Sequence, residues 1–401
     1  MNVLLVEPAF PIPPKSKNHR DFLPIGLLKL ASYHKQKGDN FRLVRGNKDT
    51  NGFVPDEVKI TSLFTYWSQY VWDSVAFYKE KFPNAKVIVG GIYASLMPEH
   101  CRKSGCDEVF VGVNDEAEKY QPAYDLVDVD YQIIHASRGC IRRCGFCGTW
   151  KIEPTFTSKR SIKEEVHSNR LIFYDNNLLA NPNITDILLE LSEMTYDNKP
   201  IYAECQCGLD GRLLNANLAK LLRTARFIYP RIAWDHSYSQ YDIIKKQIDM
   251  LVDAGYQAKD IYVFMIYNWN YDFLGLEKKR LKCWEWKVQI ADCRYRPLEQ
   301  VYDYYNPQKE QTIDEYYIHP KWIDNEIKQF RKNVRRQNIC VRHGFSFYSK
   351  DLEQKRVDQT IASKIKTVSP RGARMLLNKG IISDYWYPDT IAYPLVPPQP
   401  D

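Results

Sequence analysis

The sequence contains no apolar run approaching the length of about 18 residues that a membrane-spanning helix needs. Its opening residues, MNVLLVEPAFPIPP, carry no basic segment ahead of the apolar ones and soon reach prolines, so they are typical of a first β-strand and not of a signal peptide. Ten cysteines without such a signal indicate a reducing compartment and metal or catalytic roles. We therefore expect a cytoplasmic protein with no membrane contact.

The bulk composition is that of a folded, water-exposed chain. Of its 401 residues, 44% are hydrophobic and 26% are charged, and this length predicts two or three domains. The net charge of +7 is concentrated in one segment, because residues 321–380 hold 15 Lys and Arg against 5 Asp and Glu. The basic character therefore belongs to the C-terminal part of the chain.

Residues 1–125 alternate short aliphatic runs with helical stretches. The runs are NVLLVE, FRLV, EVKITSLF, KVIVGG and EVFVG, and the clearest helical stretch has Pro24 near its start and Gly38 at its end. This pattern predicts a doubly wound, Rossmann-like parallel sheet with loops at the strand ends that are available for a ligand. Gly90 and Gly91 are candidates for a close backbone approach to that ligand, and a tight strand-to-helix turn is the alternative.

Residues 126–300 predict a second α/β unit with longer repeats. One strand signal precedes the cysteine-rich segment and five follow it, each ending in polar residues. Six such units indicate a partial (β/α)6 TIM-type barrel, in which the active site lies at the carboxyl ends of the strands. We expect the cysteine loop to meet Asp175, Asp235 and Asn268 there.

The segment RGCIRRCGFCGTW contains Cys140, Cys144 and Cys147 in a C-x3-C-x2-C spacing, with no fourth cysteine or histidine just beyond it. Three thiolates can hold three irons of a 4Fe–4S cluster and leave the fourth iron open for a chelating ligand. The alternative is a structural zinc site or unrelated buried thiols. Zinc would require a fourth local ligand, and neither His135 nor the next cysteine, Cys205, has suitable spacing.

This motif, with Phe146 directly before Cys147 and a strand ahead of it, resembles the radical S-adenosylmethionine (SAM) superfamily. The resemblance covers about residues 126–300. It implies that the open iron binds the amino and carboxylate groups of SAM, and that one electron cleaves SAM to methionine and a 5′-deoxyadenosyl radical. It also implies an electron donor such as flavodoxin or ferredoxin. The substrate is not identified by the sequence.

Contacts to SAM are carried over residue by residue. Where the family often has a Gly-Gly-Glu-type stretch, this chain has YDNNLLANP, so Asp175, Asn176 and Asn177 become the acceptors for the SAM amino group. A turn formed by these Asx residues is the alternative. Arg212 is either the partner of the SAM carboxylate or a member of a surface ion pair.

Two later strand ends supply the remaining candidates. The resemblance assigns Asp235 to the ribose hydroxyls, and it assigns Tyr267 and Asn268 to the adenine. Cys205 and Cys207 alternate along one predicted strand and should share a face. They are either packing residues or redox partners within the barrel.

The α/β domain ahead of the motif resembles the cobalamin-binding subclass of radical SAM enzymes. The Asp-x-His-x-x-Gly motif that supplies a cobalt ligand in many cobalamin proteins is absent, because the first strand ends VEPAFPIPPK. Cobalamin would then bind without a histidine ligand and serve methylation of an unactivated carbon. In the alternative, the domain is a lid or docking module, and the reaction is a cobalamin-independent rearrangement, epimerisation or cyclisation.

Residues 301–401 predict a mainly helical, basic extension with a proline-rich tail at 387–401. In WIDNEIKQFRKNVRRQN, the residues Ile323, Ile327, Phe330 and Val334 share one helical face, and the basic residues lie largely elsewhere. These basic residues form either a solvated face or a surface for an anionic substrate or nucleic acid. No compact RNA-binding motif supports the second interpretation.

Overall fold

The computed structural model describes residues 1–12 and 23–344, so the predicted proline-rich tail lies outside the described residues. Two units can be distinguished by their internal contacts. The first comprises Met1–Cys207 with Arg296–Tyr317, and the second comprises Gly208–Tyr295 with Ile318–Asp401. We refer to them as unit 1 and unit 2 and describe each by itself.

Unit 1 begins with five parallel strands and the helices between them. These elements are β1 (Asn2–Glu7), α1 (Ile25–Gln36), β2 (Asn40–Arg45), β3 (Glu57–Ser62), α2 (Ser68–Lys81), β4 (Lys86–Gly91), α3 (Ile92–Leu96), α4 (Pro98–Arg102), β5 (Glu108–Val109) and α5 (Asp115–Glu118). The strand order is β2-β1-β3-β4-β5, with Asn2 opposite Asn40 and Val3 opposite Glu57. All five strands that the sequence predicts are present.

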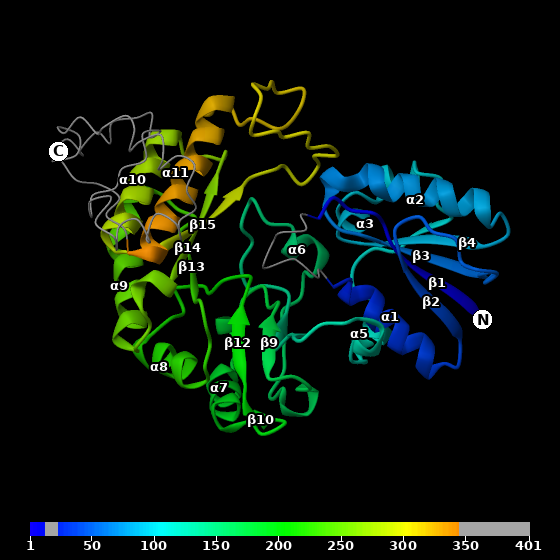
Figure 1. Cartoon of the computed structure of the whole chain (residues 1–401), viewed down its shortest axis with the longest axis horizontal. Helices are drawn as coiled ribbons and strands as arrows, with labels where there is room; N and C mark the ends of the chain where they lie inside the picture. Colours follow the sequence, from blue (N-terminus) through cyan, green and yellow to red (C-terminus); the bar gives the residue numbers. More distant parts are fainter. Residues whose placement is uncertain (13–22, 345–401) are drawn as a thin grey trace, which may run out of the picture. The chain divides into compact units, whose positions relative to one another are not determined.

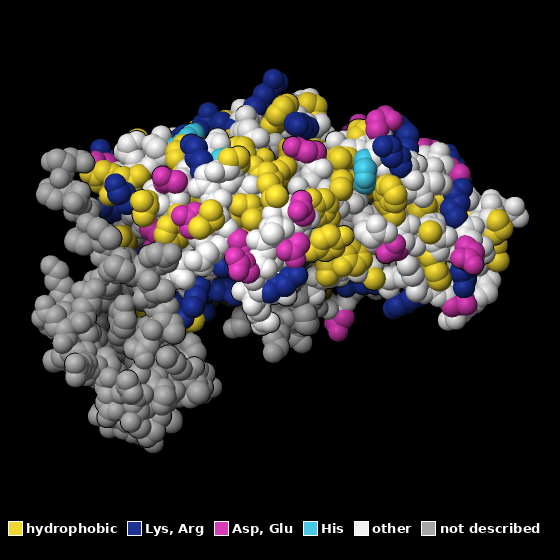
Figure 2. All heavy atoms as spheres, turned by 90° about the horizontal axis from the view of Figure 1, so that it is seen from above, with side chains coloured by type: hydrophobic (Ala, Val, Ile, Leu, Met, Phe, Trp, Pro, Cys, Tyr) yellow, Lys and Arg dark blue, Asp and Glu magenta, His cyan; other side chains and the backbone are white. Residues whose placement is uncertain are grey.

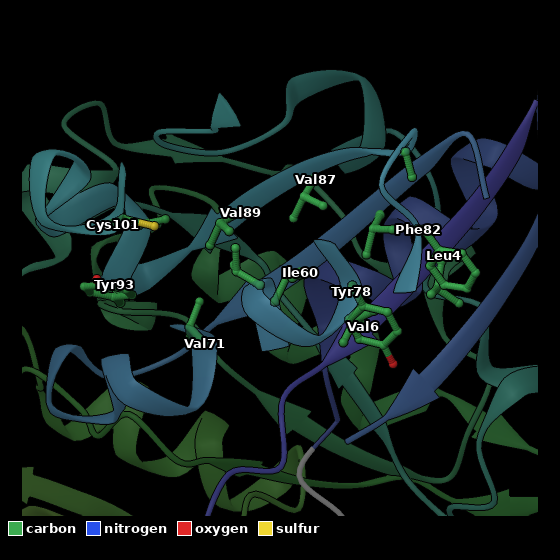
Figure 3. Close-up of a cluster of buried hydrophobic side chains, with 14 of the residues drawn as sticks. Leu4, Val6, Ile60, Val71, Tyr78, Phe82, Val87, Val89, Tyr93 and Cys101 are labelled. Atoms are coloured by element: carbon green, nitrogen blue, oxygen red, sulfur yellow. The ribbon is translucent and has the colours of Figure 1, made fainter. Parts of the chain in front are cut away.

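The alternation of side chains along β1 explains why helices cover both faces of this sheet. Leu4 and Val6 point into a core shared with α2, whereas Val3 and Leu5 point into a second core that contains Leu27 of α1. Figure 3 shows the first core, in which the Leu4 and Val6 side chains lie among those of the strands and of α2. Figure 1 shows α1 and α2 on opposite sides of the sheet.

The helix predicted between Pro24 and Gly38 is confirmed as α1. Its chain leaves the helix through Gly38, which has a φ of +74°, the left-handed conformation that commonly ends helices. Buried residues on one side of α1, such as Leu27 and Ala31, follow the expected helical spacing.

Six further strands match the predicted second α/β region, and they form two three-stranded parallel sheets. In unit 1 the order is β12-β9-β6, and in unit 2 it is β13-β14-β15. Their bounds are β6 (Gln132–Ile134), β9 (Arg170–Phe173), β12 (Tyr202–Cys205), β13 (Arg231–Ala233), β14 (Tyr262–Tyr267) and β15 (Gln289–Arg294). Sequential parallel neighbours are what a β/α repeat requires.

The remaining elements connect or cover these sheets. In unit 1 they are β7 (Ser137–Arg138), α6 (Thr149–Ile152), β8 (Thr157–Ser158), α7 (Ile184–Glu193), β10 (Thr195–Tyr196) and β11 (Lys199–Pro200). In unit 2 they are α8 (Ala216–Thr224), α9 (Tyr241–Asp253), α10 (Phe273–Glu285) and α11 (Asp324–His343). Six short 3₁₀ turns among the described residues are η1 (Thr65–Trp67), η2 (Tyr124–Leu126), η3 (Lys163–Glu165), η4 (Leu178–Ala180), η5 (Tyr238–Gln240) and η6 (Ala258–Asp260).

The basic C-terminal helix predicted near residue 323 is confirmed as α11. Ile327, Phe330 and Val334 are buried on its inner face, as expected. Ile323 is exposed, because it precedes the first helical turn and contacts the helix through its backbone: its N–H donates to Glu326 at 3.1 Å, and its carbonyl accepts from Ile327 N at 3.2 Å. The inner face of α11 therefore begins at Ile327.

Among the described residues, no helix combines the length and the apolar character that a bilayer span needs. Figure 2 shows basic and acidic side chains interspersed on the face in view, with hydrophobic side chains reaching the surface between them. Scattered exposed hydrophobic residues are normal in folded proteins, so exposure alone does not mark a site.

Gly91 provides a test of the sheet packing. It has a φ of +98°, and a Cβ atom there would lie 2.3 Å from the backbone oxygen of Ser62. We expect Gly91→Ala to lower the free energy of unfolding by about 2 kcal/mol or more, measured by urea titration. Gly26→Ala in the exposed face of α1 is the control and should raise it by about 0.5–1 kcal/mol. Equal stability of Gly91→Ala and the wild type would contradict this packing.

Candidate functional site

The three clustered cysteines lie in a loop whose two ends are joined by the antiparallel pair β7–β8. Ser137 faces Ser158, and Arg138 faces Thr157. Gly139, directly before Cys140, has a φ of +72°, and a Cβ atom there would lie 2.4 Å from the oxygen of Thr155. Only glycine fits this position without a shift of the backbone, so the path into Cys140 is fixed.

Asp175 holds the chain that leads into this loop. Its carboxylate accepts hydrogen bonds from Ala136 N (3.1 Å), Ser137 N (2.5 Å) and Ser137 Oγ (2.6 Å), and its side chain is fully buried. Burial raises the pKa of Asp175 to about 6, although the hydrogen bonds from Ser137 and Ala136 act in the opposite direction. The carboxylate that we expected to face a ligand therefore braces the protein itself.

Asn181 completes this brace from the same segment. Its Nδ2 donates to Ala136 O at 2.9 Å and to Lys159 O at 3.1 Å, and Lys159 N also donates to Ala136 O at 2.9 Å. The segment that follows β9 thus contacts both strands at the base of the cysteine loop.

Asn176 and Asn177 lie at the thiols. Asn177 Nδ2 donates to Cys140 Sγ at 3.8 Å, and a backbone N–H, that of Arg142, donates to the same sulfur at 3.3 Å. The Cys147 thiol donates to Thr149 Oγ1 at 3.3 Å, and that hydroxyl donates to Asn176 Oδ1 at 3.1 Å. Asn177 therefore contacts a thiol of the loop directly and Asn176 reaches Cys147 through Thr149, while the predicted contact of both with the SAM amino group stays a prediction.

The donor chemistry fits an iron–sulfur cluster. All three thiols are reduced and half-buried, and N–H groups point at Cys140 Sγ, as cluster thiolates require. Within residues 1–12 and 23–344, no three Cys, His, Asp or Glu side chains converge closely enough to hold an ion. A cluster would therefore require at least one of the three cysteine side chains to rotate. The backbone between the last two is held in a turn by the hydrogen bond from Cys147 N to Cys144 O at 3.1 Å.

The carboxyl edge of the five-stranded sheet adjoins the cysteine loop within unit 1. Helix α3, directly after Gly91, packs against α6, directly after the last cysteine (Figure 1). A Cβ atom on Gly148 would lie 3.2 Å from Leu96 of α3 and 3.5 Å from Leu298. The segment directly after the cysteines therefore packs at the carboxyl edge of this sheet, which is the edge where open parallel sheets bind ligands.

Exposed apolar side chains follow three neighbouring strands at this edge. They are Phe64 after β3, Ile92 after β4 and Val111 after β5, which are 37%, 42% and 52% exposed. Phe64 stacks on Tyr66, with ring centroids 5.0 Å apart, and contacts Trp67 edge-on. We call Phe64, Ile92 and Val111 the apolar rim.

The described histidines of the N-terminal region already have partners. His34 Nδ1 lies 2.8 Å from the carboxylate of Asp39, and His100 Nδ1 lies 2.6 Å from the hydroxyl of Tyr93. His19 lies outside the described residues.

In unit 2, Arg212 forms a bidentate ion pair with Asp210, at 2.6 and 3.0 Å. This is the ion-pair alternative that the sequence left open. Asp235 is partly buried, and burial raises its pKa while Lys279, His236 and Arg212 lower it. Lys279 is fully buried, donates to Trp234 O at 3.1 Å, and has its pKa lowered to about 8 by burial.

Tyr267 and Asn268 are used inside unit 2. Tyr267 is buried against Trp322 and Phe330, with ring centroids 6.2 and 5.2 Å apart. Asn268 is fully buried, and its Oδ1 accepts from His319 N at 2.8 Å. These strand-end residues thus connect β14 to the segment that leads into α11.

The two cysteines near β12 differ in their exposure to solvent. Cys205 is buried, whereas Cys207 is exposed, because β12 ends at Cys205 and strand alternation does not continue beyond it.

Sequence reasoning missed several residues that shape the loop. They are Ser137, Gly139, Thr149, Glu153 and Asn181. Gly139 beside Cys140 was the one local signal, because glycine before a ligand residue often marks a constrained turn. Glu153 carried no recognisable spacing.

No protein-family model and no curated protein match this sequence. Among solved structures, the chain is similar to a radical SAM methyltransferase, TsrM from Kitasatospora setae, with cobalamin and a [4Fe-4S] cluster bound. The TM-score is 0.55 at 12% identity, over 75% of this chain and 74% of that chain. A second TsrM structure, with tryptophan substrate and the SAM analogue aza-SAM bound, gives 0.54 at 13% identity over 75% of both chains.

At this identity the likeness concerns the fold. The chain is a mixed α/β protein with parallel sheets, and its fold is similar to that of a radical SAM methyltransferase, in agreement with the resemblance that rested on the cysteine motif.

Asp175→Ala tests the brace. Removing the carboxylate leaves buried donors on Ala136 and Ser137 without an acceptor, at about 1–3 kcal/mol for each buried group. We expect the free energy of unfolding of the cofactor-free protein to fall by at least about 2 kcal/mol in urea titration. The exposed Asp128→Ala is the control and should have little effect. If Asp175→Ala weakened SAM binding while leaving stability unchanged, Asp175 would be a ligand residue and not a brace.

Proposed function

We propose that this chain is a radical SAM enzyme that uses cobalamin to methylate an unactivated carbon of a small-molecule substrate. The observation that carries the proposal is the position of the C-x3-C-x2-C loop. It follows the first strand of a parallel sheet and packs against the carboxyl edge of a second parallel sheet, in a fold similar to that of TsrM.

Cys140, Cys144 and Cys147 hold a 4Fe–4S cluster in this proposal, and Phe146 lines the loop beside them. When bound, the cluster supplies the electron for reductive cleavage of SAM, delivered by a donor such as flavodoxin or ferredoxin. The half-buried loop limits water access, and hydrogen bonds from Arg142 N and Asn177 stabilise the thiolate of Cys140.

Asn176 and Asn177 are the proposed contacts for the SAM amino group, because both reach the cysteine loop. The assignments of Arg212 to the SAM carboxylate and of Asp235 to the ribose hydroxyls stay predictions, and Arg212 would have to leave its ion pair with Asp210 to bind SAM. The side chains of Asp175, Tyr267 and Asn268 are fully or almost fully buried within the protein. We therefore propose that these residues support the site through contacts with the protein itself.

The finer architecture also belongs to this proposal. In this proposal, residues 1–125 are a Rossmann-like cobalamin-binding domain, 126–300 are a partial (β/α)6 barrel, and 301–401 are the basic helical extension.

For the corrin ring of cobalamin, we propose a position at the apolar rim of the five-stranded sheet, with Gly90 and Gly91 behind it. Two features support this position. The topological switch point of the sheet lies between β1 and β3, where ligands of open α/β sheets bind, and the Phe64 end of the rim borders it. At the same edge, α3 after β4 packs against α6, which follows the cysteine loop. Because His34 and His100 have other partners, we expect cobalt without a ligand from either of them.

Iron binding tests the cluster. Anaerobically reconstituted wild type should contain about four irons per chain and absorb broadly near 400 nm, as thiolate-ligated clusters do. Replacing Cys140, Cys144 and Cys147 together by Ala should abolish both signals and the formation of 5′-deoxyadenosine from SAM. The matched control replaces the exposed Cys207 and Cys293 and should leave both signals unchanged. A full complement of iron in the triple variant would refute the assignment.

Cobalamin binding separates methyl transfer from the alternative chemistry. We expect Ile92→Arg to weaken hydroxocobalamin binding at least tenfold in a spectroscopic titration, because a charged side chain would replace an apolar one under the corrin. Leu189→Arg on α7 is the control, since Leu189 is 45% exposed and lies away from the strand ends. If the wild type binds no cobalamin while it still cleaves SAM, rearrangement, epimerisation or cyclisation becomes the favoured reaction.

A further inference from the structure

The carboxylate of Glu153 joins the two ends of the cysteine loop. One oxygen, Oε1, accepts from Arg138 Nη2 at 2.7 Å, and the other, Oε2, accepts from Gly139 N at 2.7 Å. Glu153 directly follows α6, whereas Arg138 and Gly139 directly precede Cys140. One side chain therefore fixes the entry to the loop relative to its exit.

The contacts continue from this carboxylate to the N-terminal helices. Arg138 Nη1 lies 4.0 Å from Glu118 Oε2 of α5, and the same oxygen accepts from Lys29 Nζ of α1 at 2.6 Å. Arg138 also donates to His135 Nε2 at 3.2 Å. We call Lys29, Glu118, Arg138 and Glu153 the charge ladder.

The charges of the ladder alternate in sign and are shielded from water. The Lys29 and Glu153 side chains are largely buried, and Glu118 and Arg138 are partly buried, so water screens them weakly. His135, the other titratable group against Arg138, stays neutral because burial lowers its pKa well below the usual value. Each ladder member thus balances its neighbours, and removal of one leaves a buried charge without its partner.

Glu153 acts on the position of Cys140 through the backbone of Gly139. Gly139 has almost no room, because a Cβ atom there would lie 2.4 Å from Thr155 O and 3.1 Å from Glu153 O. A fixed Gly139 N–H in a constrained conformation determines where the next residue, Cys140, begins.

We propose that Glu153 is a positioning residue for Cys140, and that the charge ladder mechanically couples helices α1 and α5 of the N-terminal region to the cysteine loop. We call the contacts of Glu153 with Arg138 and Gly139 the lock. The inference rests on the proposed cluster for its consequences, but the lock itself exists in the protein without cofactor. Loss of the lock lets the loop open, so a cluster bound there loses its iron faster and is held less uniformly.

The first measurement uses the full-length protein without cofactor. In hydrogen–deuterium exchange, the peptide that contains Gly139 and Cys140 should exchange at least tenfold faster in Glu153→Ala than in wild type. Glu153→Gln keeps an acceptor for Gly139 N but loses the charge that pairs with Arg138, so it should lie between the two. Glu116→Gln is the matched control, because Glu116 forms an exposed ion pair with Lys119.

The second measurement uses the same variants after anaerobic reconstitution. Iron release to a ferrous chelator should be at least tenfold faster in Glu153→Ala, and the cluster's electron paramagnetic resonance spectrum should broaden. Glu118→Gln should change both readouts in the same direction by a smaller factor, although Glu118 is far from the loop in sequence.

The outcomes separate the two proposals. If Glu153→Ala exchanges and releases iron at the wild-type rate, the positioning role is refuted. If only Glu118→Gln matches the wild type, the coupling to α1 and α5 is refuted. If the wild type binds no iron, the proposed function fails, and the exchange experiment still decides the lock. Should Glu153→Ala fail to fold, Glu153→Gln and Glu118→Gln supply the decision.

Discussion

The hydrogen bonds of one buried carboxylate determine where the candidate site can form. Asp175 accepts from two consecutive backbone N–H groups and one hydroxyl, all in the short stretch between β6 and the cysteine loop. Ionising a fully buried carboxyl group is unfavourable, and burial raises its pKa to about 6, so its donors are what make the buried site tolerable. The same segment after β9 also carries Asn177, which donates to Cys140 Sγ, and Asn176, which accepts from Thr149. The brace and the candidate ligand contacts therefore belong to one short segment.

The second constraint is the close approach of the N-terminal sheet to the loop. Gly91 ends β4 in a conformation that leaves no room for a side chain, and α3 starts directly after it. Leu96 at the end of α3 then reaches Gly148, the residue after Cys147. Gly91 lets β4 approach β3 closely, and Gly148 leaves space for the Leu96 side chain, so α3 after the sheet edge packs against α6 after the cysteine loop although the two are far apart in sequence.

Most strands and the cysteine loop could be predicted from the sequence, because both depend on local pattern. Aliphatic runs such as NVLLVE and the C-x3-C-x2-C spacing carry their meaning within a few residues. The roles of individual polar residues could not be predicted in this way. Asp175 and a ligand-binding aspartate look alike in sequence, and only the positions of Ala136 and Ser137 distinguish them. Asn268 was ambiguous for the same reason, since its partner His319 is set by a tertiary contact, whereas Arg212 pairs locally with Asp210, and the sequence does not show whether that pair or a ligand holds it.

The three cysteines also differ in how firmly the chain holds them. Cys140 follows a constrained glycine and accepts hydrogen bonds from Arg142 N and Asn177, so the folding of unit 1 largely fixes its position. Cys147 lies at the far end of a short turn, and its thiol donates to the neighbouring Thr149. Of the three thiols, Cys140 is therefore the one whose position the surrounding fold determines most firmly, which is why its neighbour Gly139 is the place where the geometry of the loop is best tested.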